Sequence, residues 1–301
     1  MNSSRSFVSH PHGLYVAWLA LCCLAFWKPL LSVTRYAANN DNASHMLMIP
    51  FLVVWLIYLE KRKIASGSLD IAAAVWFAFP AVALSAMVIR SSFADATVSM
   101  AISMLALVLF IVAGFVAVFG RVSAKSLGFS LAFLLFLVPL PQPLLARIIY
   151  LLQAGSAAVA ELIFDWTGTP ILRDGFVFHL PKINIEVAQE CSGIRSSMAL
   201  LILALLVAHF AFSTFWKKAL FVSAGLLMMV VKNGVRIATL TILANYVNPE
   251  FLYGKLHRDG GVVFFLIGLA LLWPIYWWLR RGEQVASPSP AASTLAGNSL
   301  T

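Results

Sequence analysis

Residues 97–120 read TVSMAISMLALVLFIVAGFVAVFG, a run of 24 residues without a charged side chain. A membrane-spanning helix needs about 20 predominantly apolar residues, because each residue rises about 1.5 Å across a hydrocarbon core about 30 Å thick. The whole chain of 301 residues has a similar character, with 61% hydrophobic and 11% charged residues. Since ordinary soluble domains carry about 25% charged residues, this composition excludes a soluble enzyme, a disordered chain and a protein with a basic nucleic-acid-binding face.

Several other stretches have the length and composition of membrane spans, and the sequence predicts an all-α polytopic membrane protein with about eight transmembrane helices. The predicted spans cover residues 14–33, 45–59, 71–89, 97–120, 127–145, 194–213, 219–246 and 262–279. They form one predicted membrane domain over residues 14–281. A short cytoplasmic N-terminus, residues 1–13, precedes it, and a tail of residues 282–301, rich in Ser, Pro and Ala, is expected to be disordered and cytoplasmic.

The distribution of basic residues predicts the orientation, since short loops rich in Lys and Arg lie on the cytoplasmic side of a membrane. Each even-numbered predicted span is followed by a basic cluster. The clusters are Lys61, Arg62 and Lys63; Arg121 and Lys125; Lys217 and Lys218; and Arg280 and Arg281. With eight spans all of them fall on one side, so both termini are predicted to be cytoplasmic.

The longest predicted external connection covers residues 146–193. Residues 148–166 have a helical pattern that is interrupted by polar side chains, which favours a helix at the membrane interface over a span. Asp174 and Gly175 form a turn dipeptide, and residues 183–187 alternate between apolar and polar as in a strand. We therefore expect a small extracytoplasmic cap made of one interfacial helix and a β-hairpin.

Charged residues inside a span are functional candidates, because Lys or Arg in the bilayer costs about 2.5–3.5 kcal/mol on insertion scales. The predicted span 219–246 contains Lys232, Asn233 and Arg236, and their spacing predicts one shared helical face. Arg236 lies about 25 Å along this span, close to the outer surface. Its guanidinium either reaches the outer headgroups or turns inward to bind an anion or oxyanion.

Cys191 lies in the sequence QECSGIRSS, residues 189–197, where a strand-like segment turns into a helix. Backbone amides and the positive end of the helix dipole favour a thiolate there, and Arg195 adds a positive charge one turn later. Gly193 lets the backbone approach a bound group closely. The alternative is a cysteine that only packs. Cys22 and Cys23, adjacent in an apolar span without a nearby charge, are interpreted as packing residues.

The third candidate is His257, which precedes the last predicted span and is therefore external. The topology places Cys191, Arg236 and His257 at the same membrane face, although they come from separate segments. Cysteine and histidine form the minimal nucleophile and base for acyl transfer, and an arginine can hold the oxyanion. Glu190 and His45 are weaker candidates that either support this site or are ordinary surface and loop residues. No metal-binding or phosphate-binding spacing occurs, and neither a metal nor another cofactor is expected.

Three blocks of this sequence resemble those of the exosortase/archaeosortase family of polytopic membrane cysteine proteases. They are ECSGIRS at residues 190–196, NGVRI at residues 233–237, and His257 followed by Gly260 and Gly261. Their order and predicted placement agree with the family, as do Ser44-His45 before a short span and FLVPLP at residues 136–141. The resemblance covers about residues 40–280, and the cysteine block is its most specific part.

This resemblance implies a sorting enzyme that acts outside the bacterial cytoplasmic membrane as a cysteine peptidase or transpeptidase. Its substrates would be exported proteins with a C-terminal Pro-Glu-Pro motif, a transmembrane helix and a basic tail. The family roles make Cys191 the nucleophile, Arg236 the catalytic arginine and His257 the third member of the site, with Asn233, Gly193 and Arg195 in support. The acceptor of the thioester is water or an amine or hydroxyl of a cell-surface polysaccharide or lipid.

Three alternative functions are compatible with parts of this pattern. A transporter would use Lys232, Asn233 and Arg236 to line an anion path. A scaffold for surface polysaccharide assembly would bind a partner through the external cap without cleaving it. A membrane acyltransferase would share the Cys and His chemistry and differ in its acyl donor.

Overall fold

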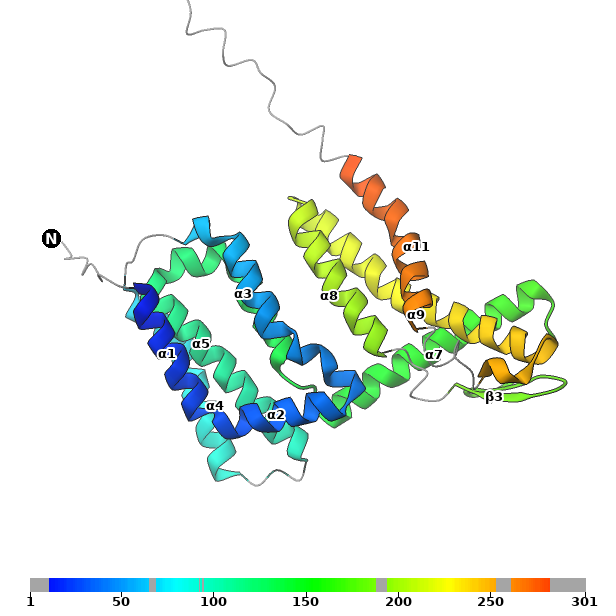
Figure 1. The fold of residues 1–301 in the computed structure, drawn as a ribbon, viewed down its shortest axis with the longest axis horizontal. Coiled ribbons are helices and arrows are strands. Elements are labelled where there is room, and N and C mark those ends of the chain that lie inside the picture. Colours follow the sequence, from blue (N-terminus) through cyan, green and yellow to red (C-terminus); the bar gives the residue numbers. More distant parts are fainter. Residues whose placement is uncertain are drawn as a thin grey trace, which may run out of the picture. The chain divides into compact units, whose positions relative to one another are not determined.

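The computed structural model describes residues 11–64, 69–91, 93, 95–187, 194–252 and 261–281. These residues are mostly helical, as Figure 1 shows, and they include seven helices long and apolar enough to cross a membrane, or eight spans if one bent helix pair is counted. The predicted all-α polytopic membrane protein is therefore confirmed. The chain divides into two compact units, Met1–Ile148 and Ile149–Thr301, which we describe separately.

Unit 1 is a bundle built around one long helix, α5, which packs against α4, α1 and α2. Its elements are α1 (Pro11–Ala25), α2 (Trp27–Asn39), η1 (Asp41–Leu47), α3 (Ile49–Leu59), η2 (Lys61–Lys63), α4 (Ile71–Arg90), α5 (Ala96–Ser126), α6 (Gly128–Ala132) and η3 (Phe133–Leu137). The indole of Trp18 fits against Gly114 and donates a hydrogen bond of 2.9 Å to the carbonyl oxygen of Phe110. Gly120, with φ 78°, ends the straight part of α5 where the span predicted at 97–120 ends.

The first predicted span, residues 14–33, is not one straight helix. It falls on α1 and α2, whose axes are bent by 75° at Phe26. Pro29 explains the break, because it has no N–H to donate to the carbonyl of Ala25 and is tolerated only in the first turn of a new helix.

The fifth predicted span, residues 127–145, is also corrected by the structure. The chain forms a short apolar helical stretch, Gly128–Leu137, and continues without helical structure to residue 141. Pro139 and Pro141 each remove a backbone donor and disfavour helical geometry at the preceding residue, so the helix stops before them. The helix predicted over residues 148–166 belongs to a longer one, α7 (Gln142–Thr167), which by length and composition is itself a candidate span.

Unit 2 contains most of α7, a small sheet and three long helices. The remaining elements are β1 (Leu172–Asp174), β2 (Val177–His179), β3 (Asn184–Glu186), α8 (Ile194–Ala211), α9 (Phe215–Tyr246), η5 (Pro249–Leu252) and α11 (Gly261–Arg281). Helices α8, α9 and α11 contact one another and lie side by side in Figure 1. These helices correspond closely to the last three predicted spans, 194–213, 219–246 and 262–279.

The predicted hairpin is present and has one more strand. α7 ends in a Schellman-type turn, in which the N–H groups of Gly168 and Thr169 bond to the carbonyls of Asp165 and Phe164. Strands β1 and β2 are joined at Gly175, whose φ of 59° suits the tight turn, and β3 pairs antiparallel with β2. The sheet therefore has the order β1-β2-β3, and its third strand lies within the segment predicted as strand from its alternation.

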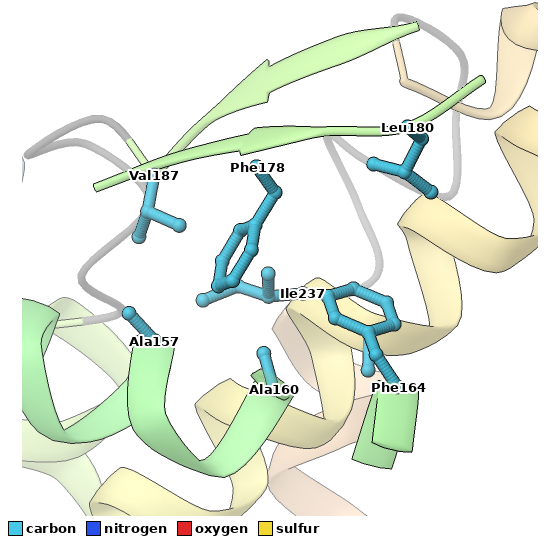
Figure 2. Close-up of a cluster of buried hydrophobic side chains, with 8 residues drawn as sticks. Ala157, Ala160, Phe164, Phe178, Leu180, Val187 and Ile237 are labelled. Carbon is cyan, nitrogen blue, oxygen red and sulfur yellow. The ribbon is translucent and has the colours of Figure 1, made fainter. Parts of the chain in front are cut away.

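The sheet packs on α7 and α9 through a buried apolar cluster, shown in Figure 2. Phe178 of β2 projects between the two helices, is fully buried, and meets the ring of Phe164 edge to face with centroids 5.3 Å apart. Ile237 of α9 and Ala160 of α7 complete the contact. Burying a phenylalanine of this kind contributes about 1.5–3 kcal/mol. The cluster fixes the sheet to the carboxyl-terminal turns of α9 that follow Arg236.

Candidate functional site

The site is organised by the antiparallel pairing of α8 and α9. Three successive contacts follow the two helices: Ala204 faces Gly225, Leu200 packs with Met229, and Ser196 bonds to Lys232. Because a residue recurs on the same helical face every three to four positions, these contacts form one continuous seam. The next turn of α9 along the seam carries Arg236, and α8 begins at Ile194 at that end.

Lys232 is a buried charged residue at the last of these three contacts between α8 and α9. Its side chain is 2% exposed, and its Nζ donates a hydrogen bond of 2.7 Å to Oγ of Ser196. The aliphatic stem packs on α11 at Gly268, where an added Cβ would lie 3.4 Å from Cδ of the lysine. Helices α8, α9 and α11 thus meet around this one side chain.

Asn233 faces a different neighbour from Lys232. Its Nδ2 donates a hydrogen bond of 3.0 Å to Oγ of Ser156 on α7, and the residue is 1% exposed. The prediction that Lys232, Asn233 and Arg236 share one face is therefore wrong for Lys232 and Asn233, because adjacent helical residues point about 100° apart. The hydrogen bond of Asn233 thus joins α9 to α7.

The crossing of α7 and α9 is unusually close around Gly234. A Cβ built at this glycine would lie 2.9 Å from the carbonyl oxygen of Ser156 and would also clash with Val159. Gly155, on the neighbouring turn of α7, faces Val230 in the same way. Small residues on both helices permit this approach, which the Asn233 hydrogen bond then fixes.

Arg236 is half-buried and lies one turn beyond Lys232, while Arg195 is exposed on the first turn of α8. Arg236 is about 32 Å from the start of α9 at 1.5 Å per residue, roughly the thickness of a bilayer core. The start of α8 therefore has positively charged side chains from both helices. A guanidinium in this position has donors suited to a carboxylate or an oxyanion.

Cys191, Glu190 and Gly193 lie outside the described residues, but both flanks of their segment are described. Upstream, the N–H of Val187 donates to the carbonyl of Phe176 over 2.9 Å, and its own carbonyl accepts a hydrogen bond from the buried side chain of Gln153. Downstream, Ile194 is buried at the start of α8. The segment thus joins an anchored strand end to an anchored helix, and the role of Cys191 remains a prediction.

His257 also lies outside the described residues, four positions before α11 begins at Gly261. His45 is half-buried in η1 of unit 1. Its supporting role in the site remains a prediction. Cys22 is buried in α1, in agreement with the packing role predicted for it, whereas Cys23 is exposed. Within the described part of the chain, no group of three or more His, Cys, Asp or Glu side chains is arranged to hold a metal ion.

The residues that hold the polar α9 side chains and the end of β3 in place were not anticipated from the sequence. Ser156 and Gln153 on α7, Ser196 on α8 and Gly268 on α11 each make a contact that organises the site. One available signal was the run AGSAAVA at residues 154–160, since consecutive small residues are typical of close helix crossings. A serine at the start of a helix carries no comparable signal, because it is equally suited to capping.

Comparison with known proteins identifies the family. Searches among curated proteins and solved structures each gave no match. A family model described as transmembrane exosortase (Exosortase_EpsH) matches residues 35–274. The matched region includes α7 to α9, the Lys232 and Arg236 turns, and the segments that carry Cys191 and His257. This multi-pass membrane protein belongs to the transmembrane exosortase family.

Proposed function

We propose that this protein is a cysteine peptidase or transpeptidase of the cytoplasmic membrane that removes C-terminal sorting signals from exported proteins. Its substrates carry a Pro-Glu-Pro-like motif, a transmembrane helix and a basic tail. Cleavage takes place at the outer membrane face through a thioester on Cys191. The observation that carries the proposal is the position of Arg236, which lies one turn beyond the Lys232–Ser196 contact, toward the end of α8 that Cys191 precedes in the chain.

The proposed reaction is acyl transfer in two steps. The thiolate of Cys191 attacks the scissile carbonyl, whose oxygen becomes an oxyanion held by the guanidinium of Arg236. His257, protonated, donates its proton to the leaving amine as the C–N bond breaks, and a thioester remains. Water, or an amine or hydroxyl of a surface polysaccharide or lipid, then loses a proton to His257 and attacks the thioester, which releases the thiolate.

Two features of unit 2 support this assignment. The start of α8 provides the positive end of a helix of 18 residues, which favours a thiolate just before it. The side chain of Arg236 is half-buried on a rigid helix, and a fixed donor stabilises developing charge better than one on a mobile loop.

The anion transporter is the weaker alternative. Two of the three side chains that would line its path, Lys232 and Asn233, are each at most 2% exposed and donate hydrogen bonds to serines of neighbouring helices. Residues that exchange ions with water need access to it, so these contacts favour a structural arrangement around Arg236 over a conduction path.

A direct test uses a tagged substrate with the tripartite C-terminal signal, co-expressed with variants of the enzyme. Cys191→Ala is expected to abolish processing, because the thioester cannot form, while the matched variants Cys22→Ala and Cys23→Ala in α1 retain it. Trapping of a substrate-enzyme thioester, released by hydroxylamine, would distinguish a peptidase from a non-catalytic scaffold. Processing by Cys191→Ala at the wild-type rate would overturn the assignment.

A further inference from the structure

Helix α2 of unit 1 does not continue the membrane span that precedes it. Its axis is bent by 75° from that of α1, and Figure 1 shows it running across the end of α1. α1 itself lies antiparallel to α5, since the ring of Tyr15 meets that of Phe119 and the ring of Phe26 meets that of Phe110. α2 therefore lies on the side of unit 1 remote from the basic residues that follow Phe119. A helix at this angle to its span runs close to the plane of the membrane.

Three faces can be distinguished on α2, because successive residues of a helix point about 100° apart. The first packs on the rest of unit 1 through the buried side chains of Val33 and Ala37. The second is exposed and mostly apolar, and it consists of Trp27, Leu31, Thr34 and Ala38. The third lies next to the second, is exposed and polar, and consists of Lys28, Ser32, Arg35 and Asn39. An apolar face beside a basic one is typical of helices that lie in a membrane interface.

The exposed apolar face suits the boundary between acyl chains and headgroups. Trp27 at its start is 56% exposed, and tryptophan is enriched at membrane interfaces. Leu31 follows one turn later and is 41% exposed. Thr34 is the one polar residue of this face, and its hydroxyl donates a hydrogen bond of 2.8 Å to the carbonyl of Leu30. The hydroxyl therefore needs no water, and the whole face can be covered by lipid.

The basic face carries two positive charges that the described residues do not neutralise. α2 contains no aspartate or glutamate, and among the described residues neither Lys28 nor Arg35 forms an ion pair. The Nζ of Lys28 lies 5.8 Å from the ring centroid of Trp27. Seven residues separate Lys28 from Arg35, so the two charges lie about 10.5 Å apart along one face. This face, beside the apolar one, complements the phosphates of lipid headgroups.

We propose that α2 is an interfacial helix that binds the phosphates of anionic lipids through Lys28 and Arg35, while Trp27 and Leu31 enter the acyl-chain region. The bilayer is the occupant because one face offers apolar area and the adjacent face positive charge, which together match an acyl chain and its headgroup. The inference does not depend on the proposed function. Family membership does not imply it either, since most of α2 precedes residue 35, where the matched region begins.

The first measurement is the depth of each face in the membrane. The full chain, with its three cysteines replaced by alanine, receives one nitroxide label through Leu31→Cys or, in a second sample, Ser32→Cys. Collision rates with oxygen, which enters the acyl chains, and with a water-soluble nickel complex are recorded in lipid nanodiscs. The label at Leu31 should collide mainly with oxygen and the label at Ser32 mainly with nickel. High nickel access at both positions would place α2 in water and overturn the inference.

The second measurement tests the charge. An environment-sensitive fluorophore on Ser32→Cys reports binding as phosphatidylglycerol replaces phosphatidylcholine in the nanodiscs. A basic residue near an anionic surface contributes about fivefold, so Lys28→Gln or Arg35→Gln should lower the apparent affinity for phosphatidylglycerol about fivefold. Lys28→Arg keeps the charge and should retain the wild-type affinity. Arg90→Gln, exposed at the end of α4, is the matched control and should leave the affinity at α2 unchanged.

Two outcomes of the second measurement would overturn the inference. One is an unchanged affinity when Lys28→Gln and Arg35→Gln are combined, since the loss expected for the pair is about 25-fold. The other is a response to a soluble acidic peptide with a Pro-Glu-Pro motif but none to phosphatidylglycerol, which would make this face a contact for the substrate. Both side chains are exposed, so their removal leaves the packed face of α2 intact. The depth measurement needs neither of these variants and tests the inference even if they do not fold.

Discussion

Among the described residues, each of the two units buries one charged side chain, and the surroundings of the two charges are opposite in kind. In unit 1, Glu60 is 7% exposed, forms an ion pair with Lys63, and accepts a hydrogen bond of 3.0 Å from Ser130. In unit 2, Lys232 is 2% exposed and donates to Ser196, on helices that contain no acidic residue. Glu60 thus has a partner of opposite charge, whereas the described helices that enclose Lys232 contain no acidic side chain that could compensate its charge.

The contact around Glu60 also shows what a structural charge cluster looks like in this chain. It joins the end of α3 to α6 and lies beside the basic residues 61–63 that predicted the cytoplasmic side. Lys232, by contrast, lies about 26 Å along α9 from Phe215, toward the predicted outer face. The difference predicts that substitutions in the two clusters separate stability from activity.

The largest expected effect is on the chemistry beside Lys232. Arg236→Met should lower the rate of substrate processing by about 10²–10³-fold, because loss of one oxyanion donor typically has this cost. The amount of folded protein should change little, since the side chain is half-buried. The measurement is the single-turnover rate of cleavage in nanodiscs. Arg121→Met in unit 1, which removes a long ion pair of 3.8 Å to Asp70, is the control. Equal rates for both variants would contradict the site assignment.

The next effect concerns the helix crossing that supports the site. Gly234→Ala should destabilise unit 2 by about 1–3 kcal/mol, because the new Cβ meets the backbone carbonyl of Ser156, which cannot move independently of α7. Gly128→Ala in unit 1 is the matched control, since nothing lies within 4 Å of its added Cβ. The free energy of unfolding in mild detergent, measured with increasing denaturant, should fall only for the Gly234 variant. A neutral result at Gly234 would mean that the α7–α9 crossing is looser than described.

A smaller effect should come from Glu60. Glu60→Gln removes the charge and keeps the shape, so Lys63 loses its pair while Ser130 retains an acceptor. We expect a loss of about 1–2 kcal/mol in unfolding free energy, since hydrogen bonds to a charged group contribute about 1.5–3 kcal/mol. Processing per folded molecule should stay at the wild-type level. A fall in processing without a loss of stability would show that Glu60, like the proposed site residues, is needed for activity.

The smallest effect is expected from the ion pair that joins the sheet to α7. Arg173 pairs with Glu161 of α7 and lies over the ring of Phe178, but both partners are partly exposed, with side chains 25% and 39% accessible. An ion pair of this exposure contributes about 0–1 kcal/mol. Arg173→Met should therefore shift the thermal midpoint only slightly, whereas Phe178→Ala, which empties the apolar cluster, should destabilise by about 3–5 kcal/mol. A larger effect at Arg173 than at Phe178 would show that the ion pair, and not the apolar cluster in Figure 2, holds the sheet against the helices.

The sequence predicted the last three membrane helices closely and two others only in part. Helices α8, α9 and α11 were found because long apolar runs between basic clusters have few alternative structures. The predicted span at residues 14–33 is bent and the one at 127–145 is interrupted, because Pro29, Pro139 and Pro141 lie inside apolar runs that hydropathy alone joins together. Of the candidate site, the sequence pointed to Arg236, Asn233 and Lys232 as exceptional but could not assign a neighbouring helix to each.

The sequence alone determined the class of this protein, since 61% hydrophobic residues in long runs leave a bilayer as the only solvent in which the chain can fold. It also identified the family blocks, because these depend on residue identity and order. Only the tertiary structure decided that Asn233 joins α7 while Lys232 is enclosed by α8 and α11. Two adjacent helical residues differ by about 100° in direction, and which helix occupies each direction is set by packing between segments far apart in the chain.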